Sequence, residues 1–169
     1  EEEEDESKAQ IKPTNRTLIS VNNPATINDL VDLGIMLTPK KKKEKLFAVH
    51  VVEPQEKEDL ARKASKKMLN SVVVKGAASE IEIKPITRFD ANVSNGILFT
   101  SRENKITDII LGVAPDTNNN PKRNQEVTTS QILASTEETV YVYNPAQPFN
   151  TLKKIVVAVN KNAESEEGF

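Results

Sequence analysis

Short apolar runs alternate along this chain with stripes of apolar residues at helical spacing. Five runs are typical of β-strands, at residues 17–21, 46–52, 80–89, 107–113 and 139–143. Helical patterns follow the first four runs and begin near Thr26, Lys57, Asn92 and Glu126. Because strands that alternate with helices form parallel sheets with right-handed crossovers, the pattern predicts an α/β domain.

Residues at the ends of these segments predict where the helices begin and end. Thr26 begins a capping-box pattern, and Asn92 is a good first residue for the third helix. Gly76 predicts the end of the second helix, because glycine readily adopts the left-handed conformation found there. Pro85 lies within the third strand pattern and therefore indicates an edge strand or a bulge.

The pattern of the first strand occurs twice. Residues 15–22 and 153–160 each begin with polar residues, continue as an apolar run and end in Asn. The second copy lies too near the end of the sequence to be followed by a domain. We therefore expect three parts: an acidic flexible linker at 1–15, an α/β domain at 16–144, and at 145–169 a linker with the first strand of a truncated second copy.

Composition narrows the classes of function. The net charge is -2 and aromatic residues make up 4% of the chain, so neither charge nor stacking side chains favour nucleic-acid binding. The chain has no cysteine, which excludes disulfides and thiolate metal sites. No apolar run approaches the roughly 20 residues that a membrane helix needs, and this predicts a soluble fragment.

His50 is the single histidine of the chain and lies in the second predicted strand. No Ser–His–Asp or Cys–His arrangement and no spaced group of carboxylates is evident around it. We interpret His50 as a structural residue. The sequence therefore predicts no catalytic residue, no metal site and no enzymatic activity.

The order and spacing of several segments resemble the universal stress protein family. The resemblance covers residues 16–143 and rests on the first strand with its helix, on residues 47–54, on residues 107–112 and on residues 132–143. It implies a Rossmann-like open sheet of five parallel strands in the order 3-2-1-4-5, with helices on both faces. It also implies that residues 153–160 open a second such unit in a tandem pair.

In nucleotide-binding members of this family, an Asp at the end of the first strand contacts the nucleoside. A G-x2-G-x9-G-[ST] loop after the fourth strand binds the phosphates, because glycines let backbone N–H groups approach them. Here Asn22 or Asn23 replaces the Asp, and Gly112 matches the first glycine. Thus the residue at the end of the fourth strand matches the family pattern, whereas the residue at the end of the first strand is Asn where the family has Asp.

The loop itself departs from the family pattern. Pro115 stands at the second glycine, and Gln125 or Glu126, depending on the alignment, stands at the third. A carboxylate near a phosphate is repelled by it, so we expect a degenerate nucleotide crevice and no cofactor, with ATP or AMP binding as the alternative. The residues expected at this crevice are Asn22, Asn23, Val52, Asp90, Gly112, Lys122, Arg123 and Glu126.

The last predicted strand is an edge strand in this sheet order. Its residues Val140, Tyr141, Val142 and Tyr143 form β-structure readily and carry no charge that would block pairing. Members of the family dimerise through this strand. We therefore expect a homodimer, or pairing with the second tandem unit, through residues 140–143.

Taken together, the sequence predicts a non-catalytic regulatory or dimerisation domain of the universal stress type. The acidic linker, the divergent crevice and the second unit resemble the cytoplasmic region that follows the membrane domain of bacterial cation/proton antiporters. That resemblance implies a location on the cytoplasmic side of the inner membrane. The alternatives are an ATP- or AMP-binding universal stress protein, free or membrane-tethered, and an enzyme of the wider adenine-nucleotide hydrolase superfamily.

Overall fold

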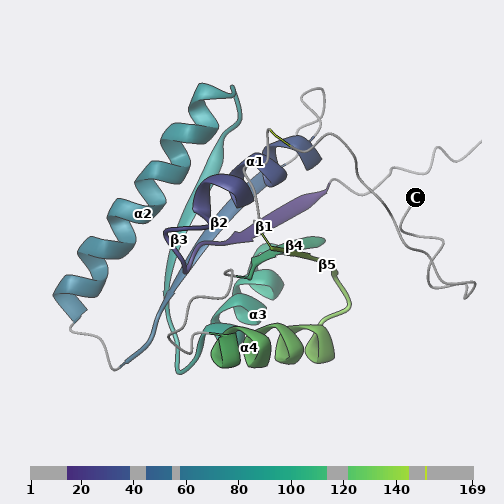
Figure 1. The fold of residues 1–169 in the computed structure, drawn as a ribbon. Helices are drawn as coiled ribbons and strands as arrows, with labels where there is room; N and C mark the ends of the chain where they lie inside the picture. The colour runs from purple at the N-terminus through teal and green to yellow at the C-terminus, as the bar shows by residue number, and fades with distance from the viewer. Residues whose placement is uncertain (1–14, 39–44, 55–57, 114–121, 145–150, 152–169) are drawn as a thin grey trace, which may run out of the picture.

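The computed structural model describes residues 15–38, 45–54, 58–113, 122–144 and 151. Within these residues, strands and helices alternate along the chain (Figure 1). The strands are β1 (Arg16–Ser20), β2 (Lys45–Val52), β3 (Ile83–Phe89), β4 (Asp108–Gly112) and β5 (Thr139–Tyr143). The helices are α1 (Ile27–Leu37), α2 (Glu58–Ala78), α3 (Val93–Asn104) and α4 (Lys122–Ser135).

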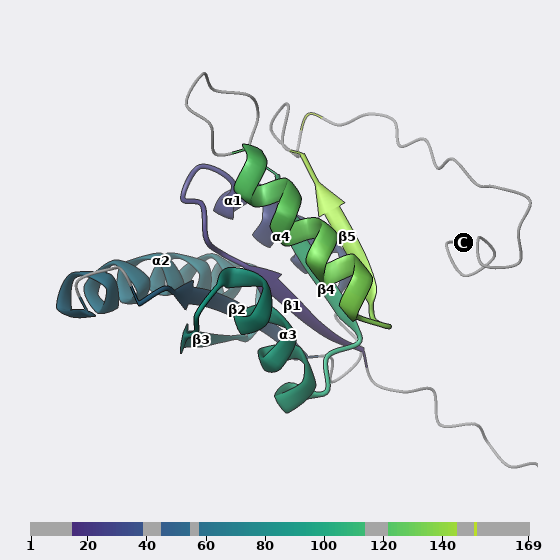
Figure 2. The same cartoon turned by 90° about the horizontal axis from the view of Figure 1, so that it is seen from below.

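All strand pairs in the sheet are parallel, and the strand order is β3-β2-β1-β4-β5. The predicted Rossmann-like α/β fold is therefore confirmed. Helices α1 and α2 pack on one face, and α3 and α4 pack on the other. Figure 2 shows α3 and α4 in front of the sheet, with α1 behind it.

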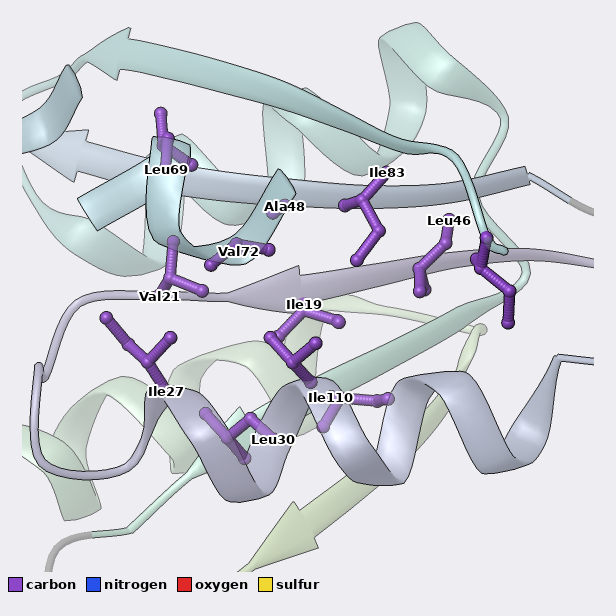
Figure 3. Packing of buried hydrophobic residues seen from close by; sticks show 12 residues of the cluster. Ile19, Val21, Ile27, Leu30, Leu46, Ala48, Leu69, Val72, Ile83 and Ile110 are labelled. Carbon is purple, nitrogen blue, oxygen red and sulfur yellow. The ribbon is translucent and has the colours of Figure 1, made fainter. Parts of the chain in front are cut away.

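The core consists of two apolar layers, one on each face of the sheet. Ile19 and Val21 point toward α1 and α2, where they meet Leu30 and Val72 (Figure 3). Leu18, which precedes Ile19, packs with Ile97 of α3 on the opposite face. Such alternation along buried strands explains the continuous apolar runs of β1, β2 and β4, since both faces are covered.

Gly76 does not end the second helix as the sequence predicted. Helix α2 continues to Ala78, and Glu80 adopts the left-handed conformation with φ 60°. The Ile81 N–H donates to the Gly76 carbonyl (2.9 Å), the pattern of a helix end of the Schellman type. Glycine is required at position 76 for space, because a Cβ there would lie 2.6 Å from Cγ1 of Ile83.

The two predicted helix starts have different outcomes. Asn92 accepts a hydrogen bond from the Asn95 N–H (2.8 Å), which confirms it as the cap of α3. Thr26 precedes α1 but its side chain makes no capping bond, so the predicted capping box is wrong. Its hydroxyl instead donates back to the Asn23 carbonyl (3.1 Å), because Thr26 stands in a turn that leads directly from β1.

The starts of two elements differ from the expected ones by several residues. Strand β3 begins at Ile83 rather than at residue 80, because the end of α2 occupies the intervening residues. Helix α4 begins at Lys122, four residues before the expected Glu126. Apart from Asn15 and Thr151, the expected acidic linker at 1–15 and the second copy at 145–169 lie outside the described residues.

Candidate functional site

The strand order reverses between β1 and β4, and a small cavity lies beyond the carboxyl ends of these two strands. This is the position where open α/β sheets bind ligands. The cavity has a volume of about 140 Å³. Its lining residues are Ser20, Asn22, Asn23, Thr26, Val93, Ile97, Leu111, Gly112, Thr128 and Thr129.

Asn22 connects the end of β1 to the neighbouring strand β2. Its side-chain oxygen Oδ1 accepts a hydrogen bond from the Val51 backbone N–H (3.2 Å). Because that N–H needs an acceptor, the amide orientation is fixed, and Nδ2 is the atom left buried without a hydrogen-bond partner among the described residues. The side-chain oxygen of Asn22 therefore stabilises the contact between the end of β1 and β2.

Asn23 and Thr26 form the turn between β1 and α1. The Asn23 side chain accepts from the Ala25 N–H (3.0 Å), which makes an Asx turn, and its carbonyl accepts from the Thr26 N–H (3.1 Å). Thr26 is almost completely buried and borders the cavity. The turn thus presents amide and hydroxyl groups at this end of the sheet.

Gly112 ends β4 at the rim of the cavity, and its lack of a side chain serves close packing. No glycine of the described residues has a positive φ, so backbone conformation does not require glycine here. A Cβ at this position would lie 2.8 Å from Leu30 Cδ1 and 3.0 Å from Thr26 Oγ1. Helix α1 therefore approaches the end of β4 as closely as glycine permits.

The cavity offers neutral polar groups and apolar walls. Among the described residues that line it, none carries a formal charge, while Ser20, Thr128 and Thr129 contribute hydroxyls. Pockets that enclose small-molecule ligands of drug size usually measure about 300–1,000 Å³. The cavity is smaller than this range, so it suits a few waters or a small uncharged molecule better than a nucleoside phosphate.

The structure brings together three of the eight predicted crevice residues, namely Asn22, Asn23 and Gly112. Val52 and Asp90 lie at the neighbouring ends of β2 and β3, where the Asp90 N–H donates to the Val52 carbonyl (3.2 Å). Neither lines the cavity, because β2 and β3 lie on the other side of β1 from β4.

The remaining three predicted crevice residues are charged and all belong to helix α4. Lys122, Arg123 and Glu126 form its first turns, and their side chains lie outside the described part of the structure. Residues 114–121, which include Pro115, also lie outside it.

The remaining lining residues were not predicted as site residues from the sequence. They are Thr128 and Thr129 of α4, Val93 and Ile97 of α3, Ser20 of β1, Leu111 of β4 and Thr26 of the turn before α1. The adjacent threonines of α4, which are weak helix formers, were the available signal. Val93 and Ile97 gave none, because apolar helix residues at this spacing are ordinarily core residues.

Strand β5 is the edge of the sheet next to β4, as predicted. Val142 is 47% exposed, whereas Tyr141 and Tyr143 pack partly against the apolar layer under α1. Burial raises the pKa of both phenols, and the Asp108 carboxylate adds to this for Tyr141. The side chains of residues 140–143 are therefore uncharged at neutral pH.

His50 is buried in β2, opposite Thr87 of β3. No group of three or more potential ligand side chains that could hold a metal ion occurs within the described residues. None of the helices in the described segments combines the length and the apolar character needed to cross a membrane.

Solved structures with the same fold include several universal stress proteins. One from Lactobacillus plantarum has a TM-score of 0.59 at 18% identity, covering 76% of this chain and 96% of that protein. One from Archaeoglobus fulgidus, in complex with dAMP, has a TM-score of 0.60 at 9% identity, covering 77% and 97%. A universal stress protein in complex with cAMP has a TM-score of 0.57 at 10% identity, covering 78% and 97%.

The described chain thus has the α/β fold of the universal stress proteins. No family model matches the sequence, and no curated protein matches it either.

Proposed function

We propose that this domain is a non-catalytic regulatory and dimerisation module of the universal stress type. Its role is to hold protein units together through β5, and its crevice has lost the ability to bind a nucleotide. The observation that carries the proposal is the cavity between β1 and β4, which measures about 140 Å³ and has no charged residue among its described lining.

The fold of the solved relatives accommodates dAMP and cAMP, so the crevice of this chain must be judged on its own residues. The Oδ1 atom of Asn22 already accepts a hydrogen bond from the Val51 N–H of β2. The side chain of Leu30 occupies the space beside Gly112 that a side chain at this position would need. Neither residue therefore offers the acidic side chain or the open backbone approach that the family uses for nucleotides. The residues described do not suit a nucleoside phosphate.

The outer edge of β5 supplies the pairing surface. Thr139 donates its N–H to Thr107 (3.0 Å) and Tyr143 accepts from the Val113 N–H (2.9 Å), so the odd-numbered residues bond to β4. Because alternate residues of a strand turn their backbone groups to opposite sides, Val140 and Val142 direct theirs away from the sheet. Two copies related by a two-fold axis would pair these groups in antiparallel fashion.

The larger protein in this proposal is a cation/proton antiporter, with the domain attached on the cytoplasmic side of its membrane part. In that setting the second tandem unit would take the place of the second copy at β5. The support is the resemblance in sequence noted for the acidic linker and for residues 153–160. Several long apolar segments encoded upstream of Glu1 would support this parent, and their absence from the complete gene would refute it.

The dimer is tested with Val142→Lys, which places a charge on the outer edge without touching the core. We expect the dissociation constant of the dimer to rise about tenfold or more, because charged edge residues oppose strand pairing. Val74→Lys is the matched control, since Val74 is 60% exposed on α2 and lies far from β5. Sedimentation equilibrium measures both, and a wild-type chain that stays monomeric at every concentration would refute the proposal.

Nucleotide binding is the second candidate function, favoured by the solved relatives in complex with dAMP and cAMP. Isothermal titration calorimetry with ATP, AMP and cyclic dinucleotides separates it from the first. The proposal expects no heat of binding for the wild type. Micromolar binding that Thr129→Val abolishes would instead establish a nucleotide site, since this change removes a lining hydroxyl while nearly keeping the volume. Gly112→Ala is unsuitable as a probe because it disturbs packing.

A further inference from the structure

Helix α2 lies beside strand β3, which forms the opposite edge of the sheet from β5 (Figure 1). The residues of α2 and β3 line a surface groove between them. One hollow of about 510 Å³ lies between Arg62, Lys66 and Asn70 of α2 and Pro85 and Thr87 of β3. A second hollow of about 290 Å³ lies beside Glu80 and Glu82. Val73 borders both hollows, so the two adjoin each other along α2.

The two ends of this groove carry opposite charge. At the end near Thr87, Lys66 lines the groove, and Lys63 and Lys67 line an adjoining hollow of α2 together with it. None of these three lysines has an ion-pair partner within the described residues. At the end near Ile83, the carboxylates of Glu80 and Glu82 are likewise unpaired in the described part of the chain. An extended segment that binds here is therefore expected to be acidic at one end and basic at the other.

The outer edge of β3 also carries backbone groups that can form hydrogen bonds with another strand. The Asp90 N–H donates to Val52 of β2, so residues of even number face β2 and those of odd number face outward. Thr87 and Phe89 thus direct their N–H groups into solvent, while Pro85 has none to direct. A second strand can pair with the half of β3 that lies at the basic end of the groove.

We propose that residues 1–12 of this chain bind in this groove as an extended segment antiparallel to β3. Their sequence has the required charge order, since residues 1–6 are all acidic and Lys8 and Lys12 follow. The chain enters the fold at Asn15, beside the first residues of β1 and β2 and so at the acidic end of the groove. Lys12 would then lie near Glu82, and residues 1–6 near the lysines of α2.

The length of the segment is sufficient. Crossing from β1 to a new position outside β3 takes three strand spacings, or about 14 Å, and following β3 to Phe89 takes about 20 Å more. An extended chain covers this distance in about ten residues. Counting back from Asn15 places Ser7 near Thr87 and Asn70, with the acidic residues beyond them.

Disulfide trapping tests the proposal, because the chain has no cysteine of its own. Ser7→Cys combined with Asn70→Cys joins the segment to the groove while leaving every charge in place. Ser7→Cys with Ser135→Cys is the control, since Ser135 is exposed near Thr107, which bonds to Arg16. At low salt, under a glutathione redox buffer, we expect the Asn70 pair to close about tenfold faster than the Ser135 pair.

Charge variants test whether the lysines of α2 cause the faster closure of the Asn70 pair. The triple variant Lys63→Gln, Lys66→Gln, Lys67→Gln should remove this preference, as should high salt, because exposed ion pairs are screened. The matched variant Lys40→Gln, Lys41→Gln, Lys42→Gln removes the same charge from the other basic run and should leave the preference unchanged. Equal closure rates for the two pairs, loss of the preference in the second triple variant, or disulfide-linked dimers in place of an internal bond would each overturn the proposal.

Discussion

Replacing Gly112 with alanine tests whether close packing requires a glycine at this position or whether the glycine instead leaves room for a ligand. The new Cβ would lie 2.8 Å from Leu30 Cδ1 and 3.0 Å from Thr26 Oγ1, both closer than ordinary van der Waals contact. Both neighbours are buried, so neither can move freely into solvent. Adding a methyl group to such a site typically costs about 1–3 kcal/mol of unfolding free energy.

A double-mutant cycle with Leu30→Ala makes this test specific. Leu30→Ala alone should cost about 2–5 kcal/mol, because it leaves a cavity in the apolar layer under α1. In the double variant the alanine at position 112 occupies part of that cavity. The combined cost should therefore be lower than the sum of the single costs by about 1–2 kcal/mol, which is a typical coupling for residues in contact.

Urea unfolding followed by circular dichroism measures all four proteins of the cycle. A cost below about 0.5 kcal/mol for Gly112→Ala, with additive effects in the cycle, would refute the packing explanation. Such a result would mean that the side chains of Leu30 and Thr26 move away from the added methyl group at little cost in free energy. Packing would then not explain the glycine at position 112, and the nucleotide-binding hypothesis would become the better explanation for it.

Two other predictions concern elements outside the crevice. Lys105 has a φ of 51°, so Lys105→Gly should raise the unfolding free energy by about 0.5–1 kcal/mol in urea, whereas Lys105→Ala, which keeps the Cβ, should give no gain. Burial acts to raise the pKa of Glu138, but hydrogen bonds from Ser101, Thr136 and the backbone outweigh it and lower that pKa. The folded state should therefore lose stability as the pH falls below about 4.5, and Glu138→Gln should reduce this loss in urea titrations across acidic pH; an unchanged pH profile would contradict the assignment.

The fold could be predicted because each strand carries its own signal. Continuous apolar runs mark β1, β2 and β4 as strands covered on both faces, and the helices between them require parallel crossovers. Gly76 was misread because sequence alone does not distinguish a glycine that ends a helix from one that lets a helix approach a strand. The distinction depends on Ile83, seven residues further along the chain, whose side chain would meet the added Cβ.

The crevice could be predicted only in part, for a geometric reason. Asn22 and Gly112 were found because they end the two strands between which the order of the sheet reverses. Val52 and Asp90 end strands as well, but their strands lie beyond β1 and their ends open elsewhere. Ile97 and Thr129 line the cavity because of the orientation of α3 and α4 relative to the sheet. No local sequence pattern encodes that orientation.

The cavity and the edge strand are structurally connected, and this connection limits how the domain could respond to a ligand. Gly112 at the cavity rim pairs with Tyr143 at the end of β5. Thr128 and Thr129 on the cavity wall belong to α4, the helix that leads into β5. A molecule in the cavity would therefore touch both elements that position β5. It would change dimerisation only to the extent that it binds the paired and unpaired forms with different affinity, because a ligand with equal affinity for both shifts neither population. A small uncharged ligand makes few contacts in about 140 Å³, so we expect strand pairing itself, rather than occupancy of the cavity, to dominate the energetics of assembly.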